Sequence, residues 1–216
     1  MAVARASPEL VTFDGLEHVI GVRHWMSDEE CRQWILRAED SAQLSNVHQA
    51  ATREMAHRVH KRMQFESEDI ALELFKRVVH YVPPTLDGLT PVGCSSNIRL
   101  YKYDRGDSFG PHIDESNPSP DGTISKFTML VYLNTVKTGD GGQTIFYADH
   151  RAKKVACSVQ PKCGFLLLHG HGDRCLTHEA QELRSGFKYV LRTDVMYGNR
   201  NIQGREIKKK RKVLKS

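Results

Sequence analysis

One short string, Gly110-Pro-His-Ile-Asp114, carries an imidazole and a carboxylate two residues apart. Successive side chains of a β-strand point to opposite faces, so His112 and Asp114 would project from one face and Ile113 from the other. An imidazole and a carboxylate on one face can bind the same cation without distorting the backbone. The string therefore predicts part of a metal site, and a further ligand must come from elsewhere in the chain.

A second histidine from a distant strand would complete this site, and His169, His171 and His178 are the nearest candidates. His178 is followed ten residues later by Lys188, which is enough chain to run along one strand, turn and start the next beside it. A lysine there could pair with the far carboxylate of a five-carbon diacid bound to the metal. We therefore choose His178 as the ligand and interpret His169 and His171 as packing residues or as neighbours of the ligands.

The three predicted ligands, His112, Asp114 and His178, form a set of two histidines and one carboxylate. Such a set occupies one face of an octahedron and leaves three positions open. Fe(II) in this arrangement is typical of oxygen-activating sites. Two open positions can chelate a 2-oxo acid and the third can bind O2, so the ligand set favours oxidation chemistry.

Short β-strands separated by turns are expected from residue 95 onward. The near-continuous apolar run Phe127–Leu133 is typical of a buried strand, and the glycine-rich segment 138–142 after it is typical of a turn. Many short strands joined by such turns indicate a β-sandwich or small barrel. The other expected strands cover residues 97–103, 144–146, 154–159, 164–169 and 189–197.

The amino-terminal part of the chain predicts a strand and two supporting helices. Residues 18–25 favour a short strand, and the capping box Ser27-Asp-Glu-Glu30 then begins a helix over about 27–39. Apolar residues at helical spacing predict a second helix over about 67–80, which the pair Pro83-Pro84 ends.

Five motifs follow one another between residues 103 and 188. They are Tyr103, Gly106, Phe109, His112 and Asp114; Thr128-Met-Leu-Val-Tyr-Leu-Asn134; Gly141-Gly-Gln-Thr-Ile-Phe146; Val159-Gln-Pro-Lys-Cys-Gly164; and His178 with Lys188. In this order and at this spacing they resemble the prolyl 4-hydroxylase-type branch of the Fe(II)/2-oxoglutarate oxygenases. The resemblance extends over about residues 18–197.

The resemblance implies a mainly β fold with flanking helices, built on a double-stranded β-helix core of the jelly-roll or cupin type. Residues 1–94 would supply the amino-terminal strand and helices packed on that core. Residues 95–199 would form the Fe(II)/2-oxoglutarate dioxygenase core, and residues 200–216 a basic tail.

The same resemblance implies Fe(II) at the three predicted ligands, with 2-oxoglutarate and O2 as cosubstrates and L-ascorbate to keep the iron reduced. By position, Lys188 would bind the distal carboxylate of 2-oxoglutarate, with Tyr103 and Thr144 as hydroxyl partners. Arg192 is a rival cation because it shares the strand parity of Lys188. A salt bridge to Asp194 or another acid is the alternative role of Arg192.

The expected reaction is hydroxylation of a C–H bond on a protein or peptide side chain, with release of succinate and CO2. Oxidative demethylation of nucleic acid uses the same iron chemistry and is the first alternative. A non-catalytic jelly-roll binding protein is the second. Two positions depart from the family: Gln143 replaces the usual acidic residue, and Asp194 stands where a tryptophan near the substrate groove is frequent, which weakens the case for proline as the target.

The positive charge is concentrated at one end of the chain. The whole sequence has a net charge of +5, but residues 205–216 hold seven basic side chains and one acidic one. The other 204 residues hold 24 basic and 25 acidic side chains, a net charge of −1. This nearly neutral balance argues against nucleic-acid binding by the folded part of the chain, because such binding needs basic side chains to contact the phosphates. We interpret the basic stretch Arg53–Arg62 as a solvated surface segment, with a partner contact as the alternative.

The tail segment 207–213 contains Lys-Lys-Lys-Arg-Lys-Val and resembles a single-cluster nuclear import signal. An exposed cationic segment of this kind can dock into an acidic groove, so it predicts an import receptor as a partner and a nuclear location. A solubilising tail or a weak RNA contact is the alternative, with a cytoplasmic location if the signal is silent.

The remaining composition is that of a soluble chain. Apolar runs fall short of the roughly 20 residues that span a bilayer, and residues 1–9 lack the apolar stretch of a signal peptide. We therefore expect neither membrane insertion nor secretion. Five cysteines, without a C-x-x-C pair, predict reduced and mostly buried thiols.

Overall fold

The computed structural model describes residues 6–41, 43–52 and 55–199. The helical segments are α1 (Asp28–Asp40), α2 (Glu68–Val78) and two short 3-10 turns, η1 (Val79–Tyr81) and η2 (Gly172–Arg174). The strands are β1 (Glu9–Thr12), β2 (Val19–Arg23), β3 (Ser45–Gln49), β4 (Arg58–Glu66), β5 (Thr90–Cys94), β6 (Asn97–Tyr103), β7 (Ser108–His112), β8 (Ile124–Tyr132), β9 (Thr144–Tyr147), β10 (Val155–Val159), β11 (Phe165–Gly170), β12 (His178–Ala180) and β13 (Lys188–Gly198).

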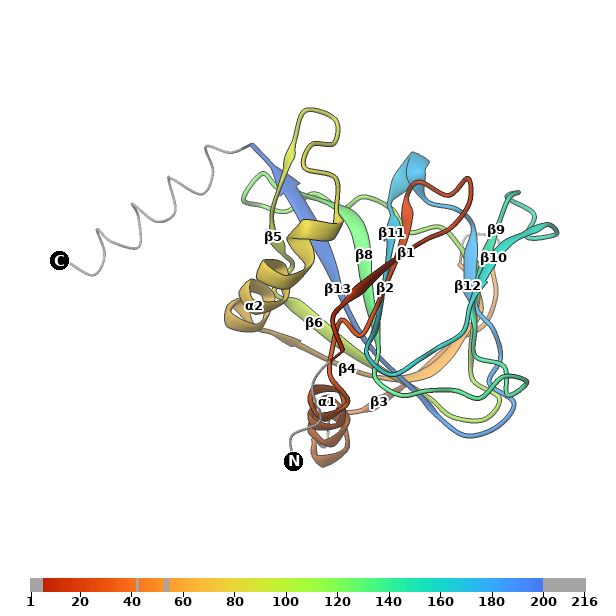
Figure 1. Ribbon diagram of the computed structural model, residues 1–216. Helices are drawn as coiled ribbons and strands as arrows, with labels where there is room; N and C mark the ends of the chain where they lie inside the picture. The colour runs from red at the N-terminus through yellow and green to blue at the C-terminus, as the bar shows by residue number, and fades with distance from the viewer. Residues whose placement is uncertain (1–5, 42, 53–54, 200–216) are drawn as a thin grey trace.

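The strands form one curved antiparallel sheet in the order β1-β2-β11-β8-β13-β6-β4-β7-β12-β9-β10. Two further strands pair outside this path, β3 with β4 and β5 with β13. Figure 1 shows the sheet bent so that β9, β10 and β12 lie on one side of the molecule and the two helices on the other. The prediction of a mainly β fold with flanking helices is confirmed.

Both predicted helices are present and begin at side-chain caps. The Ser27 hydroxyl accepts a hydrogen bond from the Glu30 backbone N–H at 3.2 Å, and the Glu30 carboxylate accepts one from the Ser27 N–H at 2.8 Å. This capping box satisfies two donors that the first turn of α1 leaves without partners. At the start of α2, the Ser67 hydroxyl accepts from the Ile70 N–H at 3.4 Å.

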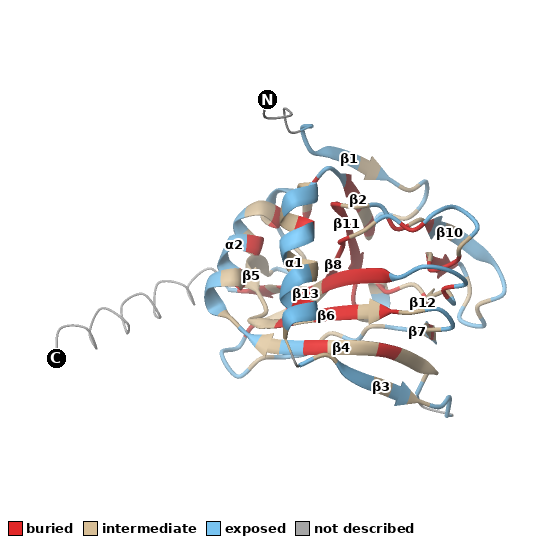
Figure 2. Cartoon of the chain, turned by 90° about the horizontal axis from the view of Figure 1, so that it is seen from below, coloured by how far each residue is buried: buried red, intermediate tan, exposed pale blue. Residues whose placement is uncertain are grey.

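The two faces of the central strands have different neighbours. On β13, Leu191 and Val195 belong to an apolar cluster that also contains Leu74 and Val78 of α2. Three residues of opposite parity, Lys188, Val190 and Arg192, point into a cavity on the other face. Figure 2 shows the buried residues concentrated on β8, β11 and β13, between these two sides. The helices therefore cover one face of the sheet and leave the other face for a site.

Strand β4 was not predicted, and the expectation of a surface segment up to residue 62 is wrong from residue 58 onward. The strand lies between β6 and β7 in the sheet, with Met63 and Phe65 packed in the apolar cluster. Its opposite face carries Arg58, His60 and Arg62, of which His60 is buried. The alternating basic side chains hide the strand, because a strand pattern is recognised from apolar residues.

All five cysteines are free thiols; Cys31 and Cys175 are buried and the other three are half-buried, so the prediction of mostly buried thiols is only partly correct. Among the described residues, no helix combines the length and the apolar character needed to cross a membrane. The predicted basic tail, residues 200–216, lies outside the described residues. The expected division into an amino-terminal part, a core and a tail stays a prediction.

Candidate active site

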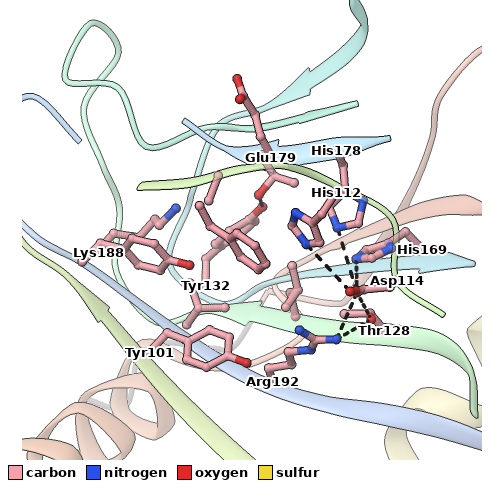
Figure 3. Close-up of a pocket in the computed structure, with 16 residues that line it drawn as sticks. Tyr101, His112, Asp114, Thr128, Tyr132, His169, His178, Glu179, Lys188 and Arg192 are labelled. Atoms are coloured by element: carbon pink, nitrogen blue, oxygen red, sulfur yellow. Dashed lines mark hydrogen bonds and ion pairs between the residues drawn. The ribbon is translucent and has the colours of Figure 1, made fainter. Parts of the chain in front are cut away.

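A cavity on the face of the sheet away from the helices gathers side chains from seven strands, β6 to β9 and β11 to β13. Figure 3 shows these side chains converging, with the histidines at one end and Lys188 at the other. Every predicted site residue lies in this group: His112, Asp114, His178, Tyr103, Thr144, Lys188 and Arg192. The sequence therefore identified residues that the fold brings into one place.

The predicted metal ligands come together at the end of β7 and the start of β12. His112 and His178 are direct partners in the register of these two strands. The Asp114 carboxylate lies 3.7 Å from His112 Nε2 and 3.9 Å from His178 Nε2. One ligand atom from each residue can be chosen so that all lie within 4.8 Å of one another. Ligand bonds of about 2.0–2.2 Å on one octahedral face place ligand atoms about 3 Å apart, so the three side chains would close by about 1 Å around an ion.

The prediction that His112 and Asp114 share a strand is only half correct. Strand β7 ends at His112, and the chain then turns away through Ile113, which is 38% exposed. The Asp114 N–H donates to Cys175 Sγ at 3.2 Å, a contact that holds the residue after the strand has ended. The two side chains still meet, but a tertiary contact positions Asp114 where strand parity was expected to do so.

Each ligand imidazole is held by a backbone carbonyl. His112 Nδ1 lies 2.8 Å from the Gly110 carbonyl oxygen, and His178 Nδ1 lies 2.9 Å from that of Leu176. A carbonyl oxygen can only accept, so Nδ1 carries the proton in both rings. Nε2 is then left with its lone pair and faces Asp114, as a metal ligand requires.

The electrostatics keep these groups in their ligand forms at neutral pH. Burial, together with the neighbouring His178, lowers the pKa of His112 to about 3. Burial likewise lowers the pKa of His178. For Asp114, burial alone would raise the pKa, but Arg192 and the histidines outweigh it and hold the pKa well below its usual range. Two neutral imidazoles and one carboxylate are the set that Fe(II) binds in facial triads.

Lys188 occupies the far end of the cavity, where it is 1% exposed. Its Nζ donates to the Gly142 carbonyl at 2.9 Å and lies 4.1 Å from the centre of the Tyr103 ring. Burial lowers the pKa of Lys188 to about 7. Thr144 is held nearby, since its hydroxyl accepts from the Tyr132 hydroxyl at 2.6 Å. This end of the cavity offers a cation and hydroxyl groups to an anion.

Lys188 reaches the cavity by a different route from the one that the spacing suggested. Strand β12 pairs with β7 and β9, whereas β13 pairs with β5, β6 and β8, so the two strands are not neighbours. The loop after β12 bonds to the turns near residues 106 and 141, and Lys188 then begins β13 in another part of the cavity wall. Ten residues connect the two walls of a curved sheet here, not two adjacent strands.

Arg192 is engaged with acids, which was its alternative role. Its Nη2 lies 3.0 Å from Asp114 Oδ2 and 3.7 Å from Asp194 Oδ1. The Thr128 hydroxyl donates to the same Asp114 oxygen at 2.6 Å. Arg192 and Thr128 thus hold one oxygen of the carboxylate, and the other oxygen stays on the His112 side.

The sequence reasoning did not select Thr128, Tyr132 or Tyr101, all of which line the cavity. Strand parity could have found the first two, because they alternate along β8 with buried residues of the apolar cluster. His171 lies outside the cavity lining and contacts Thr128 and Ser125 at 2.8 and 3.1 Å. His169 lines the cavity, with Nε2 3.8 Å from Asp114 Oδ2.

The comparisons with known proteins agree with this geometry. The profile of the 2OG-Fe(II) oxygenase superfamily matches residues 98–193. The matched segment runs from β6 into β13 and includes all of the predicted site residues. The chain is thus similar to this superfamily over its core and is a 2-oxoglutarate-dependent dioxygenase, as the sequence motifs indicated. No curated protein matches the chain.

Solved structures of prolyl hydroxylases share the fold. A viral collagen prolyl hydroxylase from Paramecium bursaria Chlorella virus 1, bound to 2-oxoglutarate, has a TM-score of 0.59 at 18% identity, covering 85% of this chain and 97% of that one. A Trichoplax adhaerens prolyl hydroxylase, bound to a hypoxia-inducible factor peptide, has a TM-score of 0.59 at 21% identity, and the match covers 82% of this chain and 83% of that one. A Pseudomonas putida prolyl-4-hydroxylase has a TM-score of 0.57 at 16% identity, and the match covers 82% of this chain and 91% of that one. The predicted jelly-roll core is confirmed.

Proposed function

We propose that this dioxygenase hydroxylates a C–H bond on a protein or peptide side chain. The observation that carries the proposal is the convergence of His112, Asp114 and His178 at one end of a cavity whose other end holds Lys188. When bound, Fe(II) with 2-oxoglutarate and O2 supplies the oxidant, and the cosubstrate leaves as succinate and CO2. L-ascorbate would keep the iron reduced.

The residues divide the work by position. His112, Asp114 and His178 would hold Fe(II) through Nε2 and carboxylate atoms whose protonation states are already those of ligands. Thr128 and Arg192 would orient Asp114 through their hydrogen bonds to Oδ2. The buried walls exclude water from the reacting centre, which strengthens each of these interactions.

Lys188 is the better anchor for the distal carboxylate of 2-oxoglutarate. Its described partners are a carbonyl oxygen and an aromatic ring, so its charge is not balanced by a described acid. Arg192 already pairs with Asp114, and moving it to the cosubstrate would leave that buried carboxylate without its cation. Tyr103 and Thr144 lie on the Lys188 side of the cavity and would bind the same carboxylate through their hydroxyl groups.

Removal of one ligand tests the iron site. His178→Ala should reduce substrate-uncoupled succinate formation to the background level, and Fe(II) binding measured under anaerobic conditions should be lost in parallel. His80→Ala, which removes an exposed histidine in η1, serves as the matched control and should retain both. Full succinate formation by His178→Ala would remove this residue from the proposed site.

The protein-side-chain substrate is favoured over nucleic acid by the charge of the body. Outside residues 205–216 the chain has slightly more acidic than basic side chains. Two of the structural neighbours are named for collagen and for a hypoxia-inducible factor peptide, both proteins. Incubation with a peptide pool and a methylated oligonucleotide pool, read by mass spectrometry, decides between gain of one oxygen on a peptide and loss of a methyl group from a base.

We also propose that segment 207–213 directs the chain to the nucleus through an import receptor. Its support is the run of basic residues Lys208-Lys-Lys-Arg-Lys212. A fluorescent fusion of the full chain should accumulate in the nucleus, and one lacking residues 205–216 should not. Equal distribution of the two fusions would reject the import role.

A further inference from the structure

The cavity face of the sheet carries more positive charge than iron and 2-oxoglutarate require. Strand β4 contributes Arg58 and Arg62, and β6 contributes Arg99. These three residues, which we name the arginine strip, have no role in the proposed binding of iron or 2-oxoglutarate. They lie half-buried beside residues that line the cavity.

The strand register places the strip on the cavity face. Arg99 of β6 is the direct cross-strand partner of Arg192 of β13, and Arg62 of β4 is the partner of Tyr101 of β6. Direct partners in an antiparallel pair project from the same face. Arg192 and Tyr101 both line the cavity, so Arg99 and Arg62 project to the same side.

Arg58 reaches the site by stacking. Its guanidinium lies 3.7 Å from the centre of the Phe109 ring, and the His112 ring lies parallel to Phe109 at 3.6 Å between centres. Two groups this close to one ring must occupy its opposite faces. Arg58 is therefore separated from a predicted iron ligand by the thickness of a single aromatic ring.

The strip lacks anionic partners. Among residues 6–41, 43–52 and 55–199, no carboxylate forms an ion pair with Arg58, Arg62 or Arg99. The Nε atoms of Arg58 and Arg99 are buried and have no hydrogen-bond acceptor among the described residues. A buried charged donor without an acceptor destabilises the protein unless a ligand supplies one. The nearby charges of Arg192 and Arg62 add to burial in lowering the pKa of Arg58.

We infer that the arginine strip binds an acidic side chain of the substrate next to the residue that is hydroxylated. The inference rests on the proposed function and specifies its substrate class as an acidic protein segment. Guanidinium groups bind carboxylate and phosphate oxygens through paired hydrogen bonds, so aspartate, glutamate and phosphorylated residues share the required chemistry.

Burial and net charge favour an acidic peptide over a nucleic acid. The strip residues are half-buried beside a cavity, whereas the recognition of a nucleic acid backbone uses an extended exposed basic surface. The body around the strip has a net charge of −1 without the tail, so it would not attract a polyanion over a distance. A small number of convergent arginines suits one or two acidic groups.

A binding experiment tests the strip independently of catalysis. Fluorescein-labelled hexaglutamate and hexaglutamine are titrated into the full chain loaded with Mn(II) and 2-oxoglutarate, and anisotropy is recorded. Arg62→Gln/Arg99→Gln should weaken hexaglutamate binding about 30-fold or more, the loss expected when one partner of a desolvated charge pair is removed. The control Arg151→Gln/Arg184→Gln removes two exposed guanidinium groups and should leave the affinity unchanged. All forms keep the basic tail, so any binding of hexaglutamate to the tail is the same in each.

Equal weakening of hexaglutamate binding in both double variants, or none in either, would overturn the inference even if peptides are hydroxylated.

A second measurement identifies substrates that carry acidic residues beside the hydroxylated side chain. Proteome-derived peptides hydroxylated by the wild-type chain should be enriched in acidic residues near the modified side chain, and replacing those acids by amides should slow the reaction. Hydroxylated peptides without that enrichment also reject the strip, whereas demethylated oligonucleotides without hydroxylated peptides reject the proposed function.

Discussion

The two faces of the central sheet differ in polarity: the face toward the helices is apolar, and the face toward the cavity carries charged side chains. Leu100 and Leu191 project toward the helices and are almost fully buried among apolar side chains. Arg99 and Arg192, one position away on the same strands, project toward the cavity. The helix face lowers the free energy of the fold by removing apolar surface from water. The cavity face carries charge whose burial opposes folding.

Hydrogen bonding makes the same distinction. Several buried polar atoms of the cavity face have no hydrogen-bond partner among the described residues, including both ring nitrogens of His169 and the Nε atoms of Arg58, Arg99 and Arg192. The helix side is capped and packed, with two helix starts closed by serine side chains. The contrast teaches that stability and chemistry are assigned to opposite sides of the same strands, so substitutions on each side should have separable effects.

The largest expected effect comes from Arg192→Met, which removes the cation beside Asp114. A buried carboxylate that loses its partner destabilises a protein by about 3–5 kcal/mol. We expect a loss of this size in the free energy of unfolding of the metal-free chain, measured by urea denaturation. Arg23→Met is the control, because Arg23 pairs with Glu9 at an exposed position and should contribute less than about 1 kcal/mol. Equal losses in both variants would contradict the contrast between the faces.

A slightly smaller effect is expected on the helix face. Leu100 is fully buried in the apolar cluster, so Leu100→Ala should lower the free energy of unfolding by about 2–5 kcal/mol. The affinity of the folded variant for Co(II), used as a spectroscopic substitute for iron, should stay unchanged. Leu72→Ala, at a residue that is 52% exposed, should be nearly neutral. A tenfold change in Co(II) affinity in Leu100→Ala would show that the faces are coupled.

The pH dependence of 2-oxoglutarate binding tests the buried lysine. In the free protein the pKa of Lys188 is lowered to about 7, so above this pH the lysine must take up a proton to pair with the cosubstrate. Affinity for 2-oxoglutarate should therefore be constant below about pH 6 and fall by up to about tenfold per pH unit above about pH 7. Calorimetry on the Mn(II)-loaded chain measures it. Lys188→Arg stays charged and should flatten the profile; an identical profile would assign the titration elsewhere.

The smallest effect is expected at the start of α1. Ser27→Ala removes one half of the capping box and should lower the free energy of unfolding by about 1 kcal/mol. Ser7→Ala, at an exposed residue near the amino terminus, is the control and should change nothing. Iron affinity should be the same in both. A loss of iron binding in Ser27→Ala would show that the helix face positions the ligands directly.

The sequence predicted the features whose patterns are local. The first helix follows from its capping box and the second from apolar spacing, and the ligand residues follow from a short motif and the interval between His178 and Lys188. Strand β4 escaped prediction because its inner face is basic, and a polar strand face looks like a surface segment. Its true neighbours are strands β6 and β7, which no local pattern reveals.

The position of Asp114 was predicted for an incomplete reason. Strand parity predicted that His112 and Asp114 project from the same face of one strand. The strand ends at His112, however, and the Cys175 sulfur accepts a hydrogen bond from the Asp114 backbone N–H. The ion pair joins Arg192 of β13 to Asp114 after β7, two strands that are not neighbours because β6 and β4 lie between them in the sheet. Strand parity could place Thr128 on the cavity face, but its hydrogen bond to Asp114 becomes visible only when the sheet is assembled.

Both imidazoles predicted to bind iron are held by the carbonyl two residues earlier in their own segment, Gly110 for His112 and Leu176 for His178. One hydrogen bond that orients each ring is therefore encoded within three consecutive residues, and the Phe109 and Phe146 rings add stacking contacts from the cavity wall. Because these hydrogen bonds are local, other residues of the cavity can change over evolutionary time while the two imidazoles keep this contact. A lineage could replace an apolar substrate wall by arginines, as on β4 and β6 here, and keep the same catalytic centre while acquiring new targets.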